Sequence, residues 1–277
     1  MNMIQQHPST NPVSRADSFS DWISEVSKKP MFRYSIRLLS VAAFFILWQW
    51  AVAVNLMWPL QFGNLPTPLE VFASWSALLV QQEYYFHIGM SIWRVVLGIA
   101  IGLAAAIPLG LWIGLSRTAT DTCFTILEIF RPVPLIAYLP VAMLLFSTIE
   151  SSIVFITFIG AFFPILINVR DAVERVPQSL VNAARCLGCS ASGIIWRVYL
   201  PAMGSQIFTG LAVGVGASWM GVITAEIMSG KHGIGYFTWT SYNLMEYEHS
   251  FIGIFTIGAL GFLSSALVRL AERKMVK

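Results

Sequence analysis

The chain has 277 residues, of which 56% are hydrophobic and only 11% are charged, and its mean hydropathy is +0.69. Because soluble domains carry about 25% charged residues, this composition excludes a water-soluble globular protein and indicates that membrane lipid is the main solvent. The net charge of +3 gives no indication of a nucleic-acid partner, since the positions of the basic residues along the chain explain it better.

The first 35 residues are polar and contain no short apolar run of the kind that a signal peptide needs. Their composition predicts a disordered cytosolic tail over residues 1–35. The remaining residues, 36–277, are expected to form a single membrane domain.

A helix needs about 20 apolar residues to cross the hydrocarbon core of a bilayer. Six segments of this chain meet that requirement, so the sequence predicts an all-α integral membrane protein with six transmembrane helices. The predicted spans are residues 38–58, 88–116, 124–148, 153–169, 203–227 and 251–268.

The basic residues are distributed unevenly between the two sides that six spans define. Fourteen of the 17 Lys and Arg precede the first span, follow the sixth, or lie in the loops after the second and fourth spans. Cytoplasmic loops carry an excess of Lys and Arg. We therefore expect both termini, and the long loop over residues 176–201, to be cytoplasmic.

Small residues and prolines recur within the predicted spans. Glycine pairs spaced four apart are typical of closely packed membrane helices, and prolines are expected to kink or break the helices that contain them. The proline bends are open to two interpretations, an irregular packing or a solute pathway between bent helices. The glycine pairs are Gly98 and Gly102, Gly110 and Gly114, and Gly210 and Gly214; the prolines are Pro108, Pro132, Pro134, Pro140 and Pro164.

Two segments on the predicted outer side have distinct compositions. Residues 71–80 form an apolar stretch that we expect to lie as a helix at the membrane interface. Residues 229–250 are rich in Tyr, Trp and Phe, which suits either the usual aromatic belt of membrane proteins or a role in gating or partner contact.

The loop over residues 176–201 carries a helical pattern. Leu180, Ala183, Ala184 and Leu187 fall at i, i+3, i+4 and i+7, which predicts one apolar face on a short helix. Gly188 permits the sharp stop that follows. Such a face must be buried either against lipid headgroups or against a cytosolic partner, and the pattern alone leaves both open.

The same loop resembles a family signature. Asn182-Ala183-Ala184, then Gly188, then Val198-Tyr199-Leu200-Pro201 match the spacing of the EAA loop of binding-protein-dependent ABC permeases, in which E-A-A, G and I-x-L-P are separated by three and nine residues. Asn182 stands in place of the glutamate and Val198 in place of the isoleucine. Further segments resemble the nitrate/sulfonate/taurine/bicarbonate branch over about residues 36–274; they include residues 65–68, 130–134, 160–164 and 233–236.

This resemblance implies a type I ABC importer fold in the bacterial inner membrane, with two permease copies, two ABC ATPase subunits, and a periplasmic or lipid-anchored solute-binding protein. It implies that the chain is not an enzyme, because ATP and Mg²⁺ would bind the ATPase subunits, and the chain has no phosphate-binding loop of its own. The residues expected to couple the permease to the ATPase are Asn182, Ala183, Ala184, Leu187, Gly188, Leu200 and Pro201.

The resemblance also suggests an anionic solute, for which cations along the path would be attractive. The residues considered for the path are Arg94, Arg131, Trp219, Thr224 and Glu226. For the two arginines the alternative is structural pairing or contact with lipid headgroups.

The sequence raises two alternative functions. An ion-coupled secondary transporter or channel would place ionisable groups within the membrane, and Glu128, Arg131 and Glu226 are candidates, with Glu128 and Arg131 close enough on one helix to pair. An intramembrane enzyme is not supported, because no metal-ligand spacing is present. Cys186 and Cys189 lack the second pair of ligands that a zinc site needs.

Overall fold

The computed structural model describes residues 30–55 and 62–275, and it divides into two units at residue 70. The first unit contains α2 (Pro30–Ala53), a 3₁₀ turn η1 (Phe62–Asn64) and the first residues of α3 (Pro68–Leu78). The first predicted span ends earlier than expected, at Ala53, and residues 56–58 of that prediction lie outside the described part of the chain.

The start of α3 is fixed by a capping box. The Thr67 hydroxyl accepts a hydrogen bond from the backbone N–H of Glu70 at 3.3 Å, and the Glu70 carboxylate accepts one from the backbone N–H of Thr67 at 2.8 Å. This reciprocal pair satisfies two backbone donors that a helix start leaves free. Pro68 occupies the first helical position, where its missing N–H costs nothing, so α3 begins three residues before the predicted interfacial stretch.

The second unit is helical throughout, with no strand among residues 71–275. Its elements are α4 (Gln82–Leu115), α5 (Arg117–Ala119), the π-helical turn η2 (Thr120–Phe124), α6 (Thr125–Phe130), α7 (Leu135–Leu145), α8 (Ile149–Arg175), α9 (Gln178–Cys186), α10 (Ala191–Ile194), the π-helical turn η3 (Ile195–Tyr199), α11 (Leu200–Ser229), α12 (Ile234–Asn243) and α13 (Tyr247–Met275).

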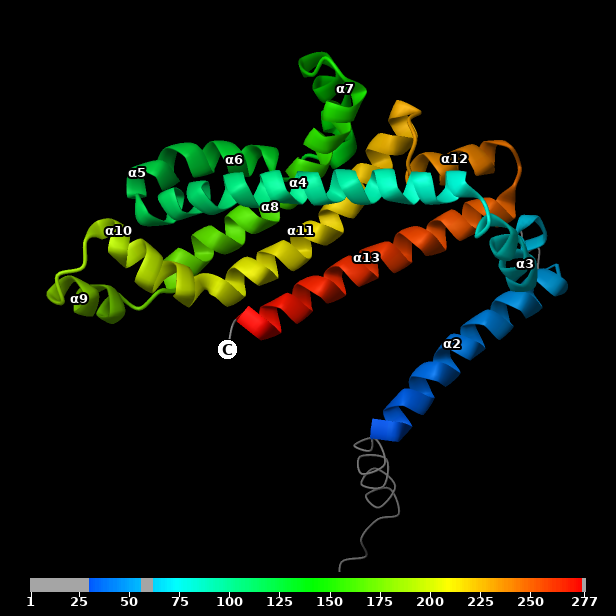
Figure 1. The fold of residues 1–277 in the computed structure, drawn as a ribbon, viewed down its shortest axis with the longest axis horizontal. Helices are drawn as coiled ribbons and strands as arrows, with labels where there is room; N and C mark the ends of the chain where they lie inside the picture. The colour runs from blue at the N-terminus through cyan, green and yellow to red at the C-terminus, as the bar shows by residue number, and fades with distance from the viewer. Residues whose placement is uncertain (1–29, 56–61, 276–277) are drawn as a thin grey trace, which may run out of the picture. The chain divides into compact units, whose positions relative to one another are not determined.

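Five helical stretches in the described residues are long and apolar enough to cross a membrane. They are α2, α4, α8, the continuous run from α10 to α11, and α13. A sixth span arises if the helical run over 117–130 and α7, which meet at an angle of 103°, are counted together. The prediction of an all-α membrane protein is confirmed, but the third predicted span is a bent pair of helices rather than one straight helix (Figure 1).

Two prolines account for the position of that bend. Pro132 and Pro134 lie between α6 and α7, where each lacks a backbone N–H and each disfavours helical geometry in the residue before it. The Tyr138 hydroxyl donates a hydrogen bond of 2.7 Å to the Phe130 carbonyl across the bend. In contrast, α4, α7 and α8 continue through Pro108, Pro140 and Pro164, so these three prolines do not break their helices.

Helix α8 packs between α4 and α11 with very close backbone approach, and glycine makes this approach possible. A Cβ atom at Gly98 would lie 2.7 Å from Cγ2 of Thr157, and one at Gly114 would lie 2.7 Å from Cβ of Val173. On the other side of α8, a Cβ atom at Gly210 would lie 2.8 Å from that of Asn168. The predicted packing role of the glycine pairs is therefore confirmed.

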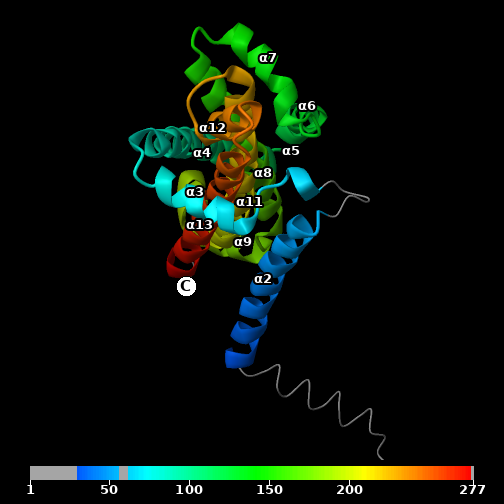
Figure 2. The ribbon, with the colours of Figure 1, turned by 90° about the vertical axis from the view of Figure 1, so that its right-hand side faces the viewer.

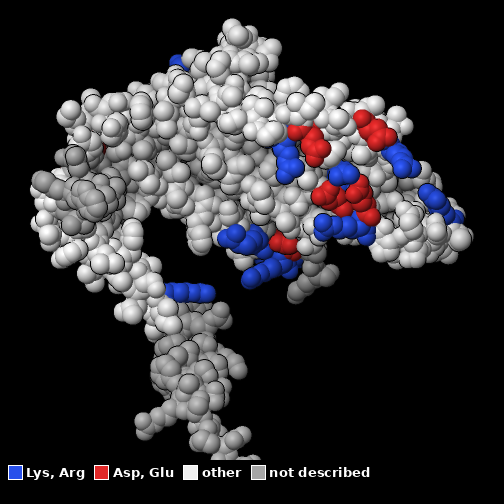
Figure 3. Space-filling model, turned by 180° about the vertical axis from the view of Figure 1, so that it is seen from behind, with Lys and Arg blue, Asp and Glu red and all other residues white. Residues whose placement is uncertain are grey.

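The two ends of this second unit differ in structure (Figures 1 and 2). The short helices α9 and α10 lie at one end, whereas α12 lies at the other, beside the first turns of α4 and α13. On the face drawn in Figure 3, most charged side chains of the unit gather toward the end that carries α9 and α10 and over the last turns of α13. This gathering matches the charge asymmetry on which the predicted topology depends.

Candidate functional site

A buried ionic network joins three long helices near the end that carries α12. Arg94 of α4 is 0% exposed, and it donates to Glu226 of α11 at 2.8 Å. It also donates two hydrogen bonds to Glu150 of α8, at 2.9 Å and 2.6 Å. Glu226 is fully buried as well, whereas the Glu150 side chain is 48% exposed. One guanidinium thus connects α4, α8 and α11 through two carboxylates of different exposure.

Both oxygens of the buried Glu226 carboxylate accept hydrogen bonds. Besides Arg94, the carboxylate accepts from the Ser91 hydroxyl at 2.8 Å and from the backbone N–H of Gly235 at 3.0 Å. The Ser91 oxygen in turn accepts from the backbone N–H of Ile234 at 2.9 Å. Because buried polar and charged groups are tolerated only when they are paired and hydrogen-bonded, this arrangement explains how the Glu226 side chain can lie within the bundle.

The turn that precedes α12 is held in place by the same network. The backbone N–H of Gly233 donates to Nδ1 of His87 at 2.9 Å, and the His232 carbonyl accepts from Arg94. Gly233 has φ +148°, and a Cβ atom at this position would overlap the Glu226 carboxylate. Glycine is required here both by conformation and by the closeness of Glu226.

Four of the five predicted path residues lie on α4 and α11, and two of them, Arg94 and Glu226, belong to the network. Arg94 and Glu226 have no exposed surface and are paired, as the alternative of structural pairing expected. Trp219 is only 5% exposed, and its indole N–H donates to Ser264 of α13 at 3.2 Å. Thr224 is half-buried and donates to a carbonyl of its own helix.

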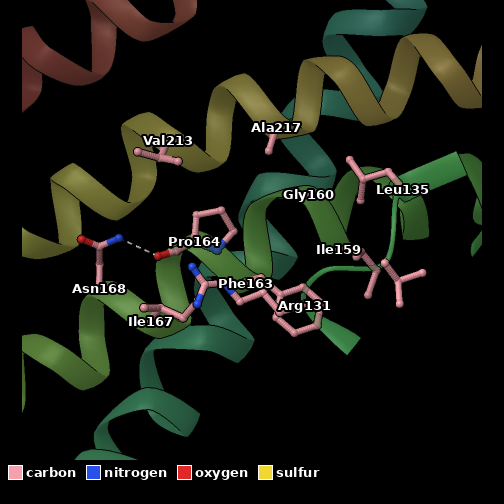
Figure 4. A pocket seen from close by; sticks show the side chains of 11 residues that line it. Arg131, Leu135, Ile159, Gly160, Phe163, Pro164, Ile167, Asn168, Val213 and Ala217 are labelled. Atoms are coloured by element: carbon pink, nitrogen blue, oxygen red, sulfur yellow. Dashed lines mark hydrogen bonds between the residues drawn. The ribbon is translucent and has the colours of Figure 1, made fainter. Parts of the chain in front are cut away.

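The fifth, Arg131, lies apart from the network in the bend between α6 and α7. It lines a pocket of about 330 Å³ and is the one charged residue of that lining (Figure 4). Among the described residues Arg131 has no ion-pair partner, and the pairing with Glu128 that their spacing allows is absent. The other residues of the lining are Val133, Leu135, Ile159, Gly160, Phe163, Pro164, Ile167, Asn168, Val213 and Ala217.

The predicted coupling loop forms a helix, α9, with two distinct faces. Val181 and Ala184 are buried against the core at this end of the bundle, together with Ile194 and Tyr199. The opposite side is exposed, including Leu187 at 83%. Of the predicted apolar face, Ala184 packs inward with Val181, one helical turn away, whereas Leu180, Ala183 and Leu187 are exposed.

The remaining coupling candidates lie at the surface or near it. Asn182, Ala183 and Gly188 are exposed, and Gly188 has φ +77°, the left-handed geometry that ends α9. Farther along the chain, Leu200 is half-buried and Pro201 is exposed, both in the first turn of α11. The expected stop at Gly188 is confirmed.

Sequence reasoning overlooked Glu150, Ser91 and His87. Their positions in the sequence do not indicate this network, since Glu150 lies 56 residues from the arginine that it binds. The available signal was indirect: Arg94 sits inside an apolar segment and needs a counter-ion.

Comparison with known proteins adds four findings. The family described as "Binding-protein-dependent transport system inner membrane component" matches residues 106–277. The nitrate import permease of Synechocystis sp. is 30% identical over 263 residues, which cover 90% of this chain and 94% of that protein. The bicarbonate transport system permease of Synechococcus elongatus is 35% identical over 188 residues, covering 68% of each chain. The nitrate import permease of Leptolyngbya laminosa is 34% identical over 218 residues, covering 76% and 78%.

Proposed function

Since this chain belongs to the family of binding-protein-dependent transport system inner membrane components, we propose that it carries a small anion, such as nitrate, bicarbonate or a sulfonate, through the pocket that Arg131 lines. The chain is a permease subunit of an ABC importer and a multi-pass protein of the cytoplasmic membrane. The relatives are named for nitrate and bicarbonate, which is why an anion is the solute proposed.

The single observation that carries the anion proposal is the unpaired guanidinium of Arg131 in an otherwise uncharged pocket. A charge within a membrane protein costs free energy unless a partner compensates it. Arg94 has two carboxylates, whereas Arg131 has no ion-pair partner among residues 30–55 and 62–275. A passing anion would supply the missing charge and form charge-assisted hydrogen bonds with the guanidinium.

The pocket is also placed suitably for a pathway. Its walls come from the bend between α6 and α7, from α8 and from α11, three segments that are distant in sequence. The bend directs Arg131 toward α8 and α11 (Figure 4). The prolines are compatible with either irregular packing or a solute pathway between bent helices. At Pro132 and Pro134, this pocket favours the pathway.

The test is uptake of labelled nitrate and bicarbonate into proteoliposomes that hold the permease with its ATPase and binding-protein partners. Arg131→Gln should lower uptake at least tenfold, because one charge-assisted contact of about 1.5–3 kcal/mol is lost. Arg131→Lys should retain part of the uptake. Arg117→Gln, an exposed arginine outside the pocket, is the matched control. Unchanged uptake by Arg131→Gln would refute the role of this pocket.

We further propose that α9 docks on an ABC ATPase subunit, which hydrolyses ATP in place of this chain. The exposed side of α9 offers Leu180, Ala183 and Leu187 next to the polar Asn182. Val181 and Ala184 fix the opposite side to the bundle, so a push on α9 would move the long helices as a rigid body. Gly188→Asp is expected to leave membrane insertion intact and to reduce co-purification of the ATPase; full co-purification would contradict the docking.

We also propose that two copies of the permease lie side by side and that a solute-binding protein docks at the end that carries α12. This end is opposite to α9 (Figure 1), as alternating access between a delivering and a driving partner requires. A secondary transporter is not favoured, because the acidic candidate Glu226 is fully occupied by Arg94, Ser91 and Gly235 and offers no site for a coupled ion.

A further inference from the structure

A second pocket, separate from the Arg131 pocket, runs as a groove between α4 and α8. It has a volume of about 690 Å³ and opens to the surface, where Trp93 is 60% exposed. Nine of its ten lining residues carry no charge, and the tenth is Glu150. The full lining is Met90, Trp93, Leu97 and Ile101 of α4, Phe146, and Glu150, Ser151, Val154, Phe155 and Phe158 of α8.

The groove has the length of one bilayer leaflet. Its lining spans Met90 to Ile101 on α4 and Glu150 to Phe158 on α8, which at 1.5 Å per residue corresponds to about 12–16 Å. One leaflet is about half of the 30 Å hydrocarbon core, or roughly 15 Å. Both helices belong to candidate membrane spans, so the groove lies where lipid is the solvent.

The polar residues of the groove gather at one end. Glu150 and Ser151 are in the first turn of α8, whereas the aromatic rings of Phe155 and Phe158 continue along the same helix with their centroids 5.9 Å apart. The groove is therefore amphipathic along its length, polar at its outer end and apolar below it. This is the profile of a phospholipid, with a headgroup above an acyl chain.

The charge of the buried network determines which headgroup fits. Arg94 carries one positive charge, and Glu150 and Glu226 carry two negative charges, so the formal net charge of the three is −1. Glu226 is buried and fully hydrogen-bonded, whereas the Glu150 side chain is 48% exposed, so Glu150 is the carboxylate that a ligand in the groove can reach. A carboxylate has about four acceptor positions, and Arg94 occupies two of those on Glu150.

From these observations we infer that the groove binds an amine-headed phospholipid, with its primary ammonium on Glu150 and one acyl chain between α4 and α8. A primary ammonium supplies both the positive charge and the N–H donors that the free acceptor positions of Glu150 require. Because no basic residue lines the groove, an anionic headgroup would meet only like charge. A second copy that docked through the same face would bring a second carboxylate of the same sign.

Native mass spectrometry of the full-length permease with its partner subunits tests this inference. The protein is equilibrated with phosphatidylethanolamine or phosphatidylglycerol of identical acyl chains, and the bound lipid is counted. The expected result is preferential retention of phosphatidylethanolamine. Glu150→Gln should lower that preference about tenfold, since one charge-assisted hydrogen bond is lost. Glu83→Gln removes an exposed carboxylate at the start of α4, outside the groove, and should leave the preference unchanged.

A second variant keeps the test decisive if Glu150→Gln disturbs the Arg94 network. Val154→Trp fills the apolar part of the groove without touching any charge, and it should reduce the retention of both lipids. Equal retention of the two lipids by the unmodified protein, or undiminished lipid on Val154→Trp, would overturn the inference. A changed oligomeric mass of Val154→Trp with lipid binding unaltered would also overturn it, because the groove would then be a contact between copies. None of these readouts depends on transport, so the inference stands or falls separately from the proposed function.

Discussion

Arg94 of α4 and Glu226 of α11 form an ion pair of 2.8 Å in which both side chains are completely buried. Removing one partner of such a pair leaves the other charge uncompensated inside the bundle, whereas removing both does not. Single and double variants of this pair can therefore distinguish a structural ion pair from residues that only contact a passing solute.

Arg94→Met should destabilise the permease by about 3–5 kcal/mol, because Glu226 would remain buried without its counter-ion. The double variant Arg94→Met with Glu226→Met should regain most of that loss. Thermal unfolding in detergent, followed by fluorescence, measures both effects. The matched control is Arg117→Met, an exposed arginine at the start of α5, which should change stability by less than about 0.5 kcal/mol. A double variant no more stable than Arg94→Met would show that the pair is not the stabilising unit.

The turn at Gly233 gives a second prediction. Its φ of +148° and the Glu226 carboxylate beside it leave no room for a Cβ atom, so Gly233→Ala must strain the backbone or displace the carboxylate. The expected loss of stability is at least about 2 kcal/mol, measured by the same unfolding assay. Gly216→Ala is the comparison, since nothing lies within 4 Å of a Cβ atom at that site of α11. Equal stability of the two variants would contradict the packing described for the turn.

Local physics explains which parts of this architecture the sequence could predict. Apolar runs such as residues 88–116, glycine pairs such as Gly98 and Gly102, and the left-handed stop at Gly188 each depend on neighbours within a few residues. The sequence predicts all three of these features. The same holds for the bend at Pro132 and Pro134, because a missing backbone N–H is a local property. Its angle of 103° depends on packing against α8 and α11 and was not predicted.

The parts that escaped prediction are contacts between distant segments. Arg94 pairs with Glu150, 56 residues away in the sequence, and with Glu226, 132 residues away. Periodicity in the sequence does not predict pairing over such separations. In α9 the apolar stripe through Leu180 and Leu187 suggests one buried face, yet those two side chains are exposed, and Val181 and Ala184 pack inward. The bundle to which an amphipathic helix is attached determines which side of that helix is buried. The sequence of the helix alone does not determine this orientation.

The two faces of α9 give the last prediction. Leu187→Asp changes a side chain that is 83% exposed, so the permease should fold and insert normally, while ATPase co-purification decreases if this face is the docking surface. Val181→Asp places a charge among Ile194, Tyr199 and Ala184 in the core, and a buried unpaired charge should destabilise the whole end of the bundle. Both substitutions replace an aliphatic side chain with aspartate and alter charge equally, but they lie on opposite faces of α9. Membrane yield and unfolding temperature separate loss of fold from loss of binding. If Leu187→Asp lowered stability as much as Val181→Asp, α9 would bury both faces, and the assignment of an outward docking surface would be wrong.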